Sequence, residues 1–402
     1  MEYRFAARMS VMKPSSIREM LKLTERPEVI SFAGGLPAPE LFPVEDIRIA
    51  AERTLQEFGS KALQYGVSEG IAPLREKIAE EMLSRGVECG RDDILITTGS
   101  QQAIDLVGKV FLNSGDCIFT ENPTYLAAIQ SFQCFQADFV PIPTDDQGII
   151  PEKFDETAGH RHAKFVYMIP NFQNPTGRTM PIERRKKLYE IAVKRNLVII
   201  EDDPYGRLRY RGTHIPPIKS FDRTGHVLYI STFSKTVSPG FRTGWIVAPK
   251  EIRDRLIITK QAADLHTSSL DQLILERYLR DFDNRSHVEK VREAYGERYV
   301  AMNAALKEHM GANWSWTHPE GGMFLWVKGP QGIDTKNLFS RAIAHNVAFV
   351  PGADFFPDGG GINYMRLNFS NSTIPTIREG ISRLAEICAK EYAETMTNEG
   401  KI

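Results

Sequence analysis

Paired cysteines and long apolar runs are both missing from this sequence. Its four cysteines, spread over 402 residues, form no CxxC pair. So few scattered thiols argue against a secreted disulfide framework and favour a reducing compartment. No stretch of about 18 apolar residues could span a bilayer, and the first residues lack the apolar core of a signal peptide. We therefore expect a cytoplasmic protein without a membrane partner.

An excess of charge of one sign is missing as well. The chain has 50 Lys and Arg against 51 Asp and Glu, a formal net charge of -1. Proteins that bind nucleic acids or anionic membranes usually carry a basic excess, so we expect neither partner. The basic run at 184–187 lies on an expected helix, where such runs are usually a solvated face. His160 and His162 have no further ligand candidates at metal spacing, so we expect no metal site.

Short apolar runs alternate with helical stretches through the middle of the chain. Continuous apolar strands separated by helices indicate a mostly parallel sheet that is covered on both faces, an α/β fold. Beyond a long helical region near 286–310, the pattern indicates a smaller α+β unit. The expected strands are 94–97, 117–120, 165–169, 197–200, 227–230, 245–248, 323–327, 347–350 and 364–369. The other expected helices are 43–58, 70–85, 100–113, 124–133, 181–195, 250–262 and one from 375.

Polar residues gather directly after four of the expected strands. In open α/β sheets, ligands bind beyond the carboxyl ends of the strands. These groups of residues are therefore expected to converge on one site. They are Gly-Ser-Gln at 99–101, Asn-Phe-Gln-Asn-Pro at 171–175, Glu-Asp-Asp-Pro-Tyr at 201–205 and Thr-Phe-Ser-Lys at 232–235.

Lys235 follows an apolar strand within a run of hydroxyl residues that ends at Arg242. Taken singly, Lys235 would be read as a solvated loop lysine. Its neighbours change that reading, because they are donors suited to a phosphate, and a Schiff-base lysine needs electropositive surroundings to lower its pKa. Backbone N–H groups at the start of a helix would add to the same anion site, although an N-cap serine is the plain alternative. The donors are Thr232, Ser234, Arg242, Ser100 and Gln101.

Asp202 ends an expected buried strand, where an unpaired carboxylate would be costly. A protonated pyridine nitrogen would be a suitable partner, because an aspartate there keeps the ring cationic and able to accept electrons. The alternative is a capping aspartate ahead of Pro204. Tyr205 and Asn174 could hydrogen-bond the phenolic oxygen of such a ring, and Tyr125 could stack on its face. Each is equally compatible with a turn or core position.

One arginine interrupts an apolar strand pattern near the C-terminus. Arg366 stands in Tyr-Met-Arg-Leu-Asn-Phe at 364–369. Bidentate capture of a substrate carboxylate would account for a guanidinium there. A surface-facing strand arginine is the alternative.

Seven motifs in order resemble the fold-type I, class I/II aminotransferases. The resemblance covers almost the whole chain and is nearest to the subgroup of 2-aminoadipate (LysN-like) and kynurenine/aminoadipate aminotransferases. The motifs are Ser-Phe-Ala-Gly-Gly-Leu-Pro-Ala-Pro-Glu (31–40), Leu-Gln-Tyr (63–65), Thr-Thr-Gly-Ser-Gln-Gln (97–102), Gln-Asn-Pro-Thr-Gly (173–177), Glu-Asp-Asp-Pro-Tyr (201–205), Ser-Lys-Thr-Val-Ser-Pro-Gly-Phe-Arg (234–242) and Gly-Gly-Met-Phe (321–324).

The resemblance implies a fold and a division of the chain. The fold would be that of PLP-dependent transferases of fold type I, with a mostly parallel seven-stranded sheet and a small α+β domain built from both chain ends. Residues 1–60 would form an N-terminal arm and part of the small domain. Residues 61–290 would form the large domain that binds pyridoxal 5'-phosphate (PLP), and residues 291–402 the C-terminal small domain.

The resemblance also implies a role for each site residue. Lys235 would be the Schiff-base lysine and proton shuttle, with Asp202 at the pyridinium nitrogen. The substrate α-carboxylate would be held by Arg366 and Asn174, with the Gly35 backbone nearby. The other cofactor contacts would be Asn174 and Tyr205 at the phenolic oxygen, Tyr125 on the ring face, and Ser100, Gln101, Thr232, Ser234 and Arg242 at the phosphate.

Two segments carry implied roles outside this set. Tyr65 would reach the phosphate of the neighbouring subunit, which implies a homodimer with shared active sites. Ser15 and Arg18 would lie on an N-terminal helix that covers the substrate side chain, with Arg18 setting specificity. A solvated helix arginine is the alternative reading of Arg18.

The reaction implied by this resemblance is transamination in a ping-pong cycle. The amino donor would be 2-aminoadipate, glutamate, a leucine-like or an aromatic amino acid, and the acceptor a 2-oxo acid such as 2-oxoglutarate. A PLP-dependent lyase, decarboxylase or racemase is the alternative, because fold does not determine reaction. A non-enzymatic regulator with an aminotransferase-like domain is a more remote one. The sequence begins at the expected arm, so we expect no DNA-binding module.

Overall fold

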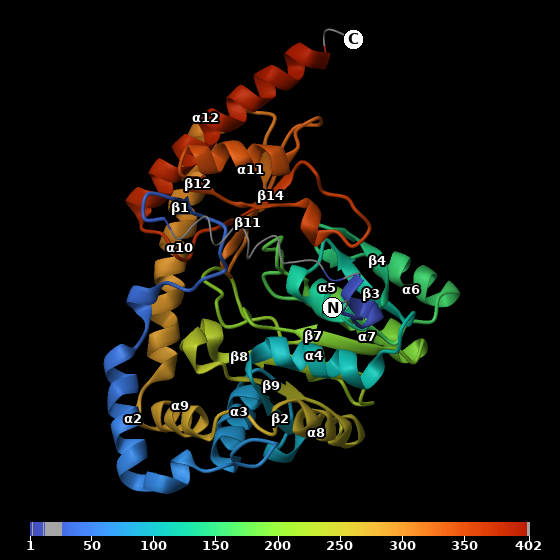
Figure 1. Cartoon of the computed structure of the whole chain (residues 1–402), viewed down its shortest axis with the longest axis vertical. Coiled ribbons are helices and arrows are strands. Elements are labelled where there is room, and N and C mark those ends of the chain that lie inside the picture. Colours follow the sequence, from blue (N-terminus) through green and yellow to red (C-terminus); the bar gives the residue numbers. More distant parts are fainter. Residues whose placement is uncertain (2, 11, 13–25, 400–402) are drawn as a thin grey trace.

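A large mixed sheet is the main feature of the computed structural model, which describes residues 1, 3–10, 12 and 26–399 (Figure 1). Its strands are β2 (Ile94–Thr97), β3 (Cys117–Asn122), β4 (Asp138–Asp145), β5 (Gly148–Ile149), β6 (Phe165–Met168), β7 (Val198–Asp202), β8 (Val227–Thr232) and β9 (Gly244–Val247). They lie in the order β2-β9-β8-β7-β6-β3-β4-β5. The pairs from β4 through β3, β6 and β7 to β8 are parallel. β9 is antiparallel to both its neighbours, and β5 to β4.

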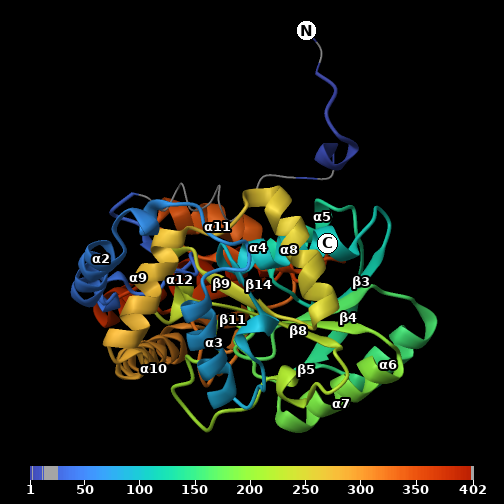
Figure 2. The same cartoon turned by 90° about the horizontal axis from the view of Figure 1, so that it is seen from below.

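Helices cover both faces of this sheet. Figure 2 shows α4 (Gly99–Phe111) and α8 (Lys250–Asp264) on one side, with α6 (Pro151–His160) and α7 (Ile182–Lys194) on the other. All residues of β2, β6, β8 and β9 are buried, because strands between two helical layers have no solvated face. In the described part of the chain before residue 282, the remaining α-helices are α2 (Val44–Phe58), α3 (Ala72–Ser84), α5 (Leu126–Gln133) and α9 (Ser269–Asp281).

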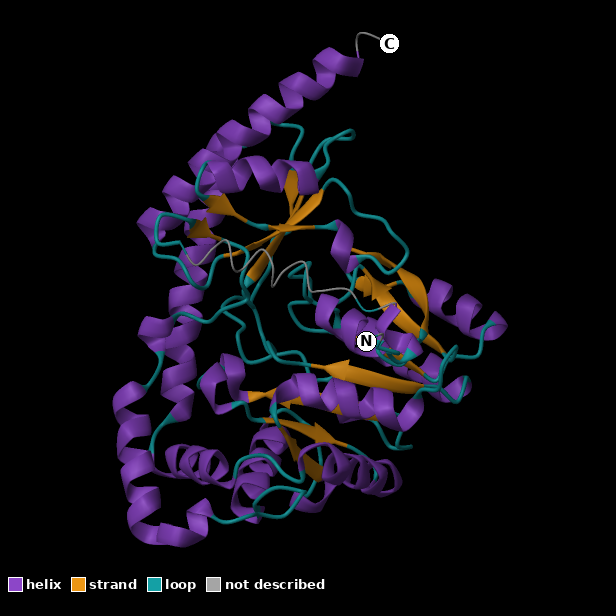
Figure 3. Cartoon of the chain, in the orientation of Figure 1, coloured by secondary structure: helices purple, strands orange, loops and turns teal. Residues whose placement is uncertain are grey.

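A second group of strands lies apart from the large sheet (Figure 3). It consists of β10 (Ser315–Trp316), β11 (Phe324–Lys328), β13 (Val350–Pro351) and β14 (Tyr364–Asn368), antiparallel in the order β10-β11-β14-β13. Nearby, β1 (Ile30–Ser31) pairs in parallel with β12 (Val347–Ala348), so a segment of the N-terminal part of the chain joins the C-terminal part. The helices here are α10 (Asn284–His309), α11 (Thr335–Ala344) and α12 (Ile374–Glu399).

Short 3-10 helices connect several of these elements. The two that matter for the site are η6 (Phe233–Lys235), directly after β8, and η7 (Pro239–Phe241), which precedes β9. The hydroxyl oxygens of Thr232 and Ser238 accept hydrogen bonds from the first turns of η6 and η7. The others are η1 (Ala7–Ser10), η2 (Pro39–Leu41), η3 (Gly59–Leu63), η4 (Arg91–Asp93), η5 (Ile218–Phe221) and η8 (Ala353–Phe355).

The expected α/β fold with a mostly parallel sheet is confirmed, and most expected strands and helices lie close to their predicted bounds. The strand expected at 347–350 is instead two short strands, β12 and β13, which belong to different sheets. Strands β1, β4, β5 and β10 and helices α6, α9 and α11 were not expected. β4 is only partly buried, and Pro141 and Pro143 interrupt its apolar residues and lack the N–H donors of an ordinary strand. β4 completes a set of seven strands, and the two residues of β5 add an eighth at the edge.

The interpretation of the basic run at 184–187 as a solvated face is wrong for one residue. Arg185 is completely buried. Its Nε donates to the carbonyl of Met180 at 2.9 Å, and its Nη2 donates to Oδ1 of Asn171 at 2.6 Å. Helical spacing places Arg185 on the same inner face of α7 as Leu188 and Ala192, so its guanidinium enters the interior.

We propose that the chain divides as the sequence indicates, into 1–60, 61–290 and 291–402. The large sheet lies within residues 94–247 and the small sheet within residues 315–368, which supports this division. None of the helices in the described part of the chain is long and apolar enough to cross a membrane. Among the same residues, no group of His, Cys, Asp or Glu side chains is placed to hold a metal ion.

Candidate active site

A cavity of about 510 Å³ lies beyond the carboxyl ends of β2, β6, β7 and β8. The predicted residues that line it are Gly35, Ser100, Gln101, Tyr125, Asn174, Asp202, Tyr205, Thr232, Ser234, Lys235, Arg242 and Arg366. The structure therefore brings together nearly all of the side chains that the sequence placed in one site. This follows from the topology, since the carboxyl ends of parallel strands lie at one edge of a sheet.

Lys235 stands at the end of η6 with its amine in this cavity. Its Nζ donates a hydrogen bond to the carbonyl of Gly35 at 2.8 Å. Desolvation lowers the pKa of Lys235 to about 8, and the nearby positive charges of Arg366 and Arg242 act in the same direction. An amine with that pKa is partly neutral near physiological pH, which suits a nucleophile or a proton carrier.

Arg242 and Gly99 form one side of an anion cradle. Arg242 has a left-handed backbone conformation at the end of η7, and its guanidinium lies against the start of α4. Gly99 has a φ of +73°, and a Cβ there would lie 2.5 Å from Nη2 of Arg242. Glycine is therefore needed at this position, both for its backbone conformation and for the close approach of the guanidinium. The backbone N–H groups of Ser100 and Gln101 lie in the first turn of α4. An anion bound beside Arg242 would be stabilised by these N–H groups at the helix N-terminus.

Hydroxyl groups form the other side of the cradle. The Oγ1 of Thr232 accepts a hydrogen bond from the backbone N–H of Ser234 at 3.1 Å and lies 2.8 Å from its Oγ. The side chains of both residues line the cavity. Guanidinium, hydroxyl and helix N-terminus together are the donors that phosphate groups prefer in proteins.

Asp202, at the end of β7, presents one unoccupied carboxylate oxygen. Its Oδ2 accepts a hydrogen bond from the hydroxyl of Tyr167 at 2.6 Å. Its Oδ1 is buried and has no hydrogen-bond partner among the residues that the structure describes. Burial raises the pKa of Asp202 to about 7, the Tyr167 hydrogen bond opposes this rise, and the charge of Asp203 adds to it. A buried oxygen of this kind fits a cationic donor such as a protonated ring nitrogen.

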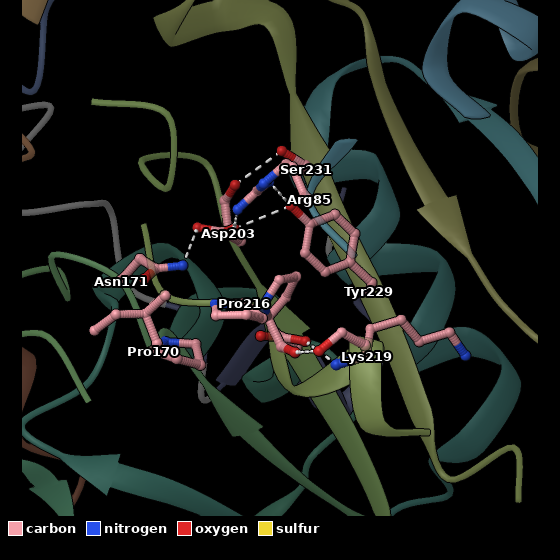
Figure 4. A network of polar contacts seen from close by, with 12 residues as sticks. Arg85, Pro170, Asn171, Asp203, Pro216, Lys219, Tyr229 and Ser231 are labelled. Carbon is pink, nitrogen blue, oxygen red and sulfur yellow. Dashed lines mark hydrogen bonds and ion pairs between the residues drawn. The ribbon is translucent and has the colours of Figure 1, made fainter. Parts of the chain in front are cut away.

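Asp203, the next residue, is fully engaged on the far side of β7 (Figure 4). It forms an ion pair with Arg85 and accepts hydrogen bonds from the hydroxyl of Tyr229 at 3.0 Å and from Nδ2 of Asn171 at 3.0 Å. Burial alone would raise its pKa, but the Arg85 guanidinium holds the pKa of Asp203 below its ordinary value. Asp202 and not Asp203 is therefore the carboxylate available to a ligand.

Arg366 is buried and not surface-facing, with only 3% of its surface exposed. Its Nη1 donates to Oδ1 of Asn174 at 2.8 Å and its Nη2 to the carbonyl of Ala33 at 2.7 Å. The guanidinium carbon lies 4.2 Å from the centre of the Phe324 ring. Asn174 in turn donates through Nδ2 to the Tyr205 hydroxyl at 3.4 Å. The cavity thus holds a fixed cation beside the amide and phenol groups.

Comparison with known proteins identifies the group to which this architecture belongs. The sequence model of the family "Aminotransferase class I and II" matches residues 28–384. The chain belongs to this family. It is an aminotransferase of fold type I whose cofactor is PLP.

Relatives of this aminotransferase match over nearly their full length. The chain is 48% identical, over 386 residues, to aromatic-amino-acid aminotransferase 1 of Thermococcus litoralis, covering 94% of this chain and 93% of that protein. It is 44% identical to the 2-aminoadipate transaminase of Thermus thermophilus, with 92% of each chain covered. The crystal structure of LysN, an α-aminoadipate aminotransferase from Thermus thermophilus complexed with N-(5'-phosphopyridoxyl)-L-leucine, superimposes with a TM-score of 0.91 at 40% identity, covering 97% of this chain and 98% of that one.

The residues of this aminotransferase fit its cofactor. The unpaired Oδ1 of Asp202 matches a protonated pyridine nitrogen, and the cradle around Arg242 matches a phosphate. The amine of Lys235 shares the cavity with both. The end of β7 supplies Asp202, and the turn after β8 supplies Lys235. Gly99 leaves the space in which the guanidinium of Arg242 lies.

Of the predicted site residues, Tyr65 does not line the cavity. Tyr65 is 79% exposed and lies apart from the cavity, with its ring edge-on to His266 at 5.8 Å between centres. Ser15 and Arg18 lie outside the described residues.

Sequence reasoning missed several residues that the fold places at the site. Tyr167 contacts Asp202 from behind, and Phe324 lies under Arg366. Tyr167 was detectable as the one hydroxyl-bearing residue of the apolar run at 165–169. The other lining residues that were missed are Leu126, Ala127, Gln130, Ile169, Pro204 and Pro239. Pro204 and Pro239 lie within two of the motifs, whereas the other four lie outside all seven.

Proposed function

We propose that this aminotransferase moves the amino group of an amino acid to a 2-oxo acid such as 2-oxoglutarate in a ping-pong cycle. One observation carries the proposal. An amine of lowered pKa on Lys235, an unpaired buried carboxylate oxygen on Asp202 and a buried guanidinium on Arg366 line the same cavity. These are the groups needed to carry a proton, to hold a cationic ring and to bind a carboxylate.

Several side chains would hold the cofactor. Asp202 would pair with the ring nitrogen, Asn174 and Tyr205 would hydrogen-bond the phenolic oxygen, and Tyr125 would stack on the ring face. The phosphate would be held by Ser100, Gln101, Thr232, Ser234 and Arg242. When bound, PLP supplies an electron sink for the negative charge that develops at the substrate Cα.

Arg366 and Asn174 would bind the α-carboxylate of the substrate, near the backbone of Gly35. The guanidinium is already desolvated and aimed by Asn174 and the carbonyl of Ala33, so little side-chain freedom is lost when a carboxylate binds. Burial lowers the pKa of Arg366 only to about 10, so the guanidinium stays charged at neutral pH. In this orientation the substrate Cα would lie toward Lys235, whose amine would accept the Cα proton.

The donor would be 2-aminoadipate, glutamate, a leucine-like or an aromatic amino acid. Two relatives named for aromatic amino acids and for 2-aminoadipate support this range. The lining residues Leu126, Ile169 and Phe324 offer apolar contact to a side chain. Ser15 and Arg18, outside the described residues, would cover the donor, and Arg18 would select acidic side chains through a charge-assisted hydrogen bond.

We further propose that the active form is a homodimer with shared sites. Tyr65 is exposed on its own chain beside Leu63 and Val67, which are 69% and 58% exposed. A group of exposed apolar side chains suits a protein interface. Across it, Tyr65 would reach the phosphate bound by the partner.

A donor screen by single half-reactions tests the proposal. The purified enzyme, loaded with PLP, is mixed with one amino acid at a time in the absence of an acceptor, and the products are separated. Transamination gives one equivalent each of the 2-oxo acid and pyridoxamine phosphate, and adding 2-oxoglutarate regenerates PLP. Release of carbon dioxide, β-elimination products or racemised amino acid without pyridoxamine phosphate would instead identify a decarboxylase, lyase or racemase.

A further inference from the structure

Tyr167 is the one side chain of the described structure that donates a hydrogen bond to Asp202. It lies on β6, whose register with β7 pairs Tyr167 with Ile200. Asp202 is two residues beyond Ile200, so both side chains point to the same face of the sheet, and a long side chain can reach this diagonal neighbour. The Tyr167 hydroxyl accordingly donates to Oδ2 of Asp202 at 2.6 Å.

The Tyr167 hydroxyl is held firmly in place. The residue is completely buried, and its ring lies edge-on to Phe132 with 5.8 Å between centres. Burial, together with the charge of Asp202, raises the pKa of Tyr167 well above its ordinary value, so it remains a donor over the working pH range. Rotation of the Asp202 carboxylate would break the hydrogen bond, so Oδ1 remains the oxygen without a partner among the described residues, in a residue that lines the cavity.

We propose that Tyr167 is a positioning residue of the transamination reaction: its hydroxyl aims Oδ1 of Asp202 at the ring nitrogen and stabilises the carboxylate as an anion. Tyr167 itself lies behind Asp202, away from the cofactor. The inference rests on the proposed role of Asp202. A carboxylate with a strong donor on one oxygen is a weaker base, so the shared proton stays on the ring nitrogen.

Tyr229 provides a matched control. It is also a completely buried tyrosine, on β8, the neighbour of β7 on its other side. Its register partner is Glu201, so its side chain lies on the opposite face of the sheet from Asp202. Its hydroxyl donates to Oδ2 of Asp203 at 3.0 Å. Tyr229→Phe therefore removes the same atom, bound to a neighbouring aspartate, without touching Asp202.

The test is ¹⁵N NMR of the holoenzyme reconstituted with PLP that is labelled at the ring nitrogen. For Tyr167→Phe, we expect the resonance to move toward the value of an unprotonated ring. We also expect kcat to fall by a factor of about 10 to 100, the usual effect of losing a hydrogen bond to a charged group. KM for the amino donor stays close to wild type because Arg366 is intact. Tyr229→Phe lowers the melting temperature but leaves the resonance and kcat unchanged.

The outcomes separate this inference from the proposed function. If Asp202→Asn moves the resonance and Tyr167→Phe does not, the role of Tyr167 is refuted while that of Asp202 stands. If neither variant moves it, the assignment of Asp202 itself fails. Should Tyr167→Phe not fold, Tyr167→Met also removes the hydroxyl, with a flexible side chain that can fill the buried space. Its resonance should move toward the unprotonated value as well, and no movement would overturn the inference.

Discussion

Two adjacent aspartates at the carboxyl end of β7, Asp202 as its last residue and Asp203 directly after it, have opposite environments. Asp202 and Asp203 are equally buried, at 2% and 1% exposure. Asp202 has one hydrogen bond, one oxygen without a partner in the described structure, and a pKa that burial raises to about 7. Asp203 has an ion pair with Arg85, hydrogen bonds from Tyr229 and Asn171, and a lowered pKa.

This comparison shows that partners, and not burial, distinguish a functional carboxylate from a structural one. Burying a carboxylate that lacks partners reduces the free energy of unfolding. Such a carboxylate is retained where a bound ligand supplies the missing partner. A buried carboxylate whose partners are all present belongs to the scaffold. The network of Asp203 extends to Asn171 (Figure 4), and Asn171 in turn accepts a hydrogen bond from Arg185. Asn171 lies three residues before Asn174. The hydrogen bonds of Asp203 and Asn171 thus hold in place the two segments whose nearby residues, Asp202 and Asn174, line the cavity.

Among the changes on the side of the sheet that carries the cavity, Lys235→Ala should reduce turnover most. Turnover should fall by at least about 10⁴-fold, because the variant loses both the covalent attachment of PLP and the proton carrier. The variant should fold normally, since the Lys235 side chain makes a single hydrogen bond, to a backbone carbonyl. Borohydride reduction of the wild-type enzyme followed by peptide mapping should find the phosphopyridoxyl group on Lys235. Its recovery on another lysine would refute the central assignment.

Replacing each aspartate separately by asparagine tests whether Asp202 acts in catalysis and Asp203 in folding stability. Asp202→Asn should cost several kcal/mol of transition-state stabilisation, roughly a 10³-fold loss in kcat/KM, while PLP still binds through the phosphate cradle. Asp203→Asn should mainly reduce the free energy of unfolding and leave kcat of the folded enzyme much closer to wild type. Steady-state kinetics and urea unfolding of both variants provide the measurement. If Asp203→Asn proves more damaging to kcat, the two roles are reversed.

Removing Arg85 should damage the scaffold face alone. Arg85→Met leaves Asp203 as an uncompensated buried charge, so we expect a loss of about 3–5 kcal/mol in the free energy of unfolding. Removing both charges, in Arg85→Met with Asp203→Leu, should cost less than the single change because no unpaired charge remains. Thermal and urea unfolding measure both effects. Equal losses for the single and double variants would mean that packing, and not charge pairing, accounts for the destabilisation.

The smallest effect is a difference in pH dependence, seen in the cofactor-free protein. Above about pH 4 the unfolded chain has lost the proton of Asp202, whereas the folded protein keeps it up to a pKa of about 7. The contribution of Asp202 to stability therefore falls as the pH rises through this window. Asp203, with a lowered pKa, contributes stability that is present above 3.8 and lost as the pH falls through its folded pKa.

Consequently, Asp202→Asn should become more favourable relative to wild type between about pH 4 and 7. Asp203→Asn should be most damaging at neutral pH and less so in acid. Urea unfolding at a series of pH values measures both trends. If the free energy of unfolding of the two variants changed with pH in the same way, the carboxylates of Asp202 and Asp203 would not have the different environments described here.

The sequence by itself determined which residues would meet. Apolar runs marked β6, β7 and β8, and the polar residues after them had to lie at one edge because parallel strands end together. The sequence predicted that Lys235, Asp202, Asn174 and Arg242 would meet in one site, and all four line the same cavity. The role of Asp202 at a ring nitrogen followed from its place after a buried apolar run and from the resemblance to the family.

Only the tertiary structure decided what each side chain meets. Arg185 belongs to a basic run that reads as solvated, yet it is buried because the packing of α7 turns that position inward. Tyr167 reads as one more core residue of an apolar strand, yet strand register puts its hydroxyl on Asp202. Local composition indicates which elements form, because periodicity is a property of neighbouring residues. The partner of a buried polar atom comes from a different strand or helix, so it is known only when the register and packing are known.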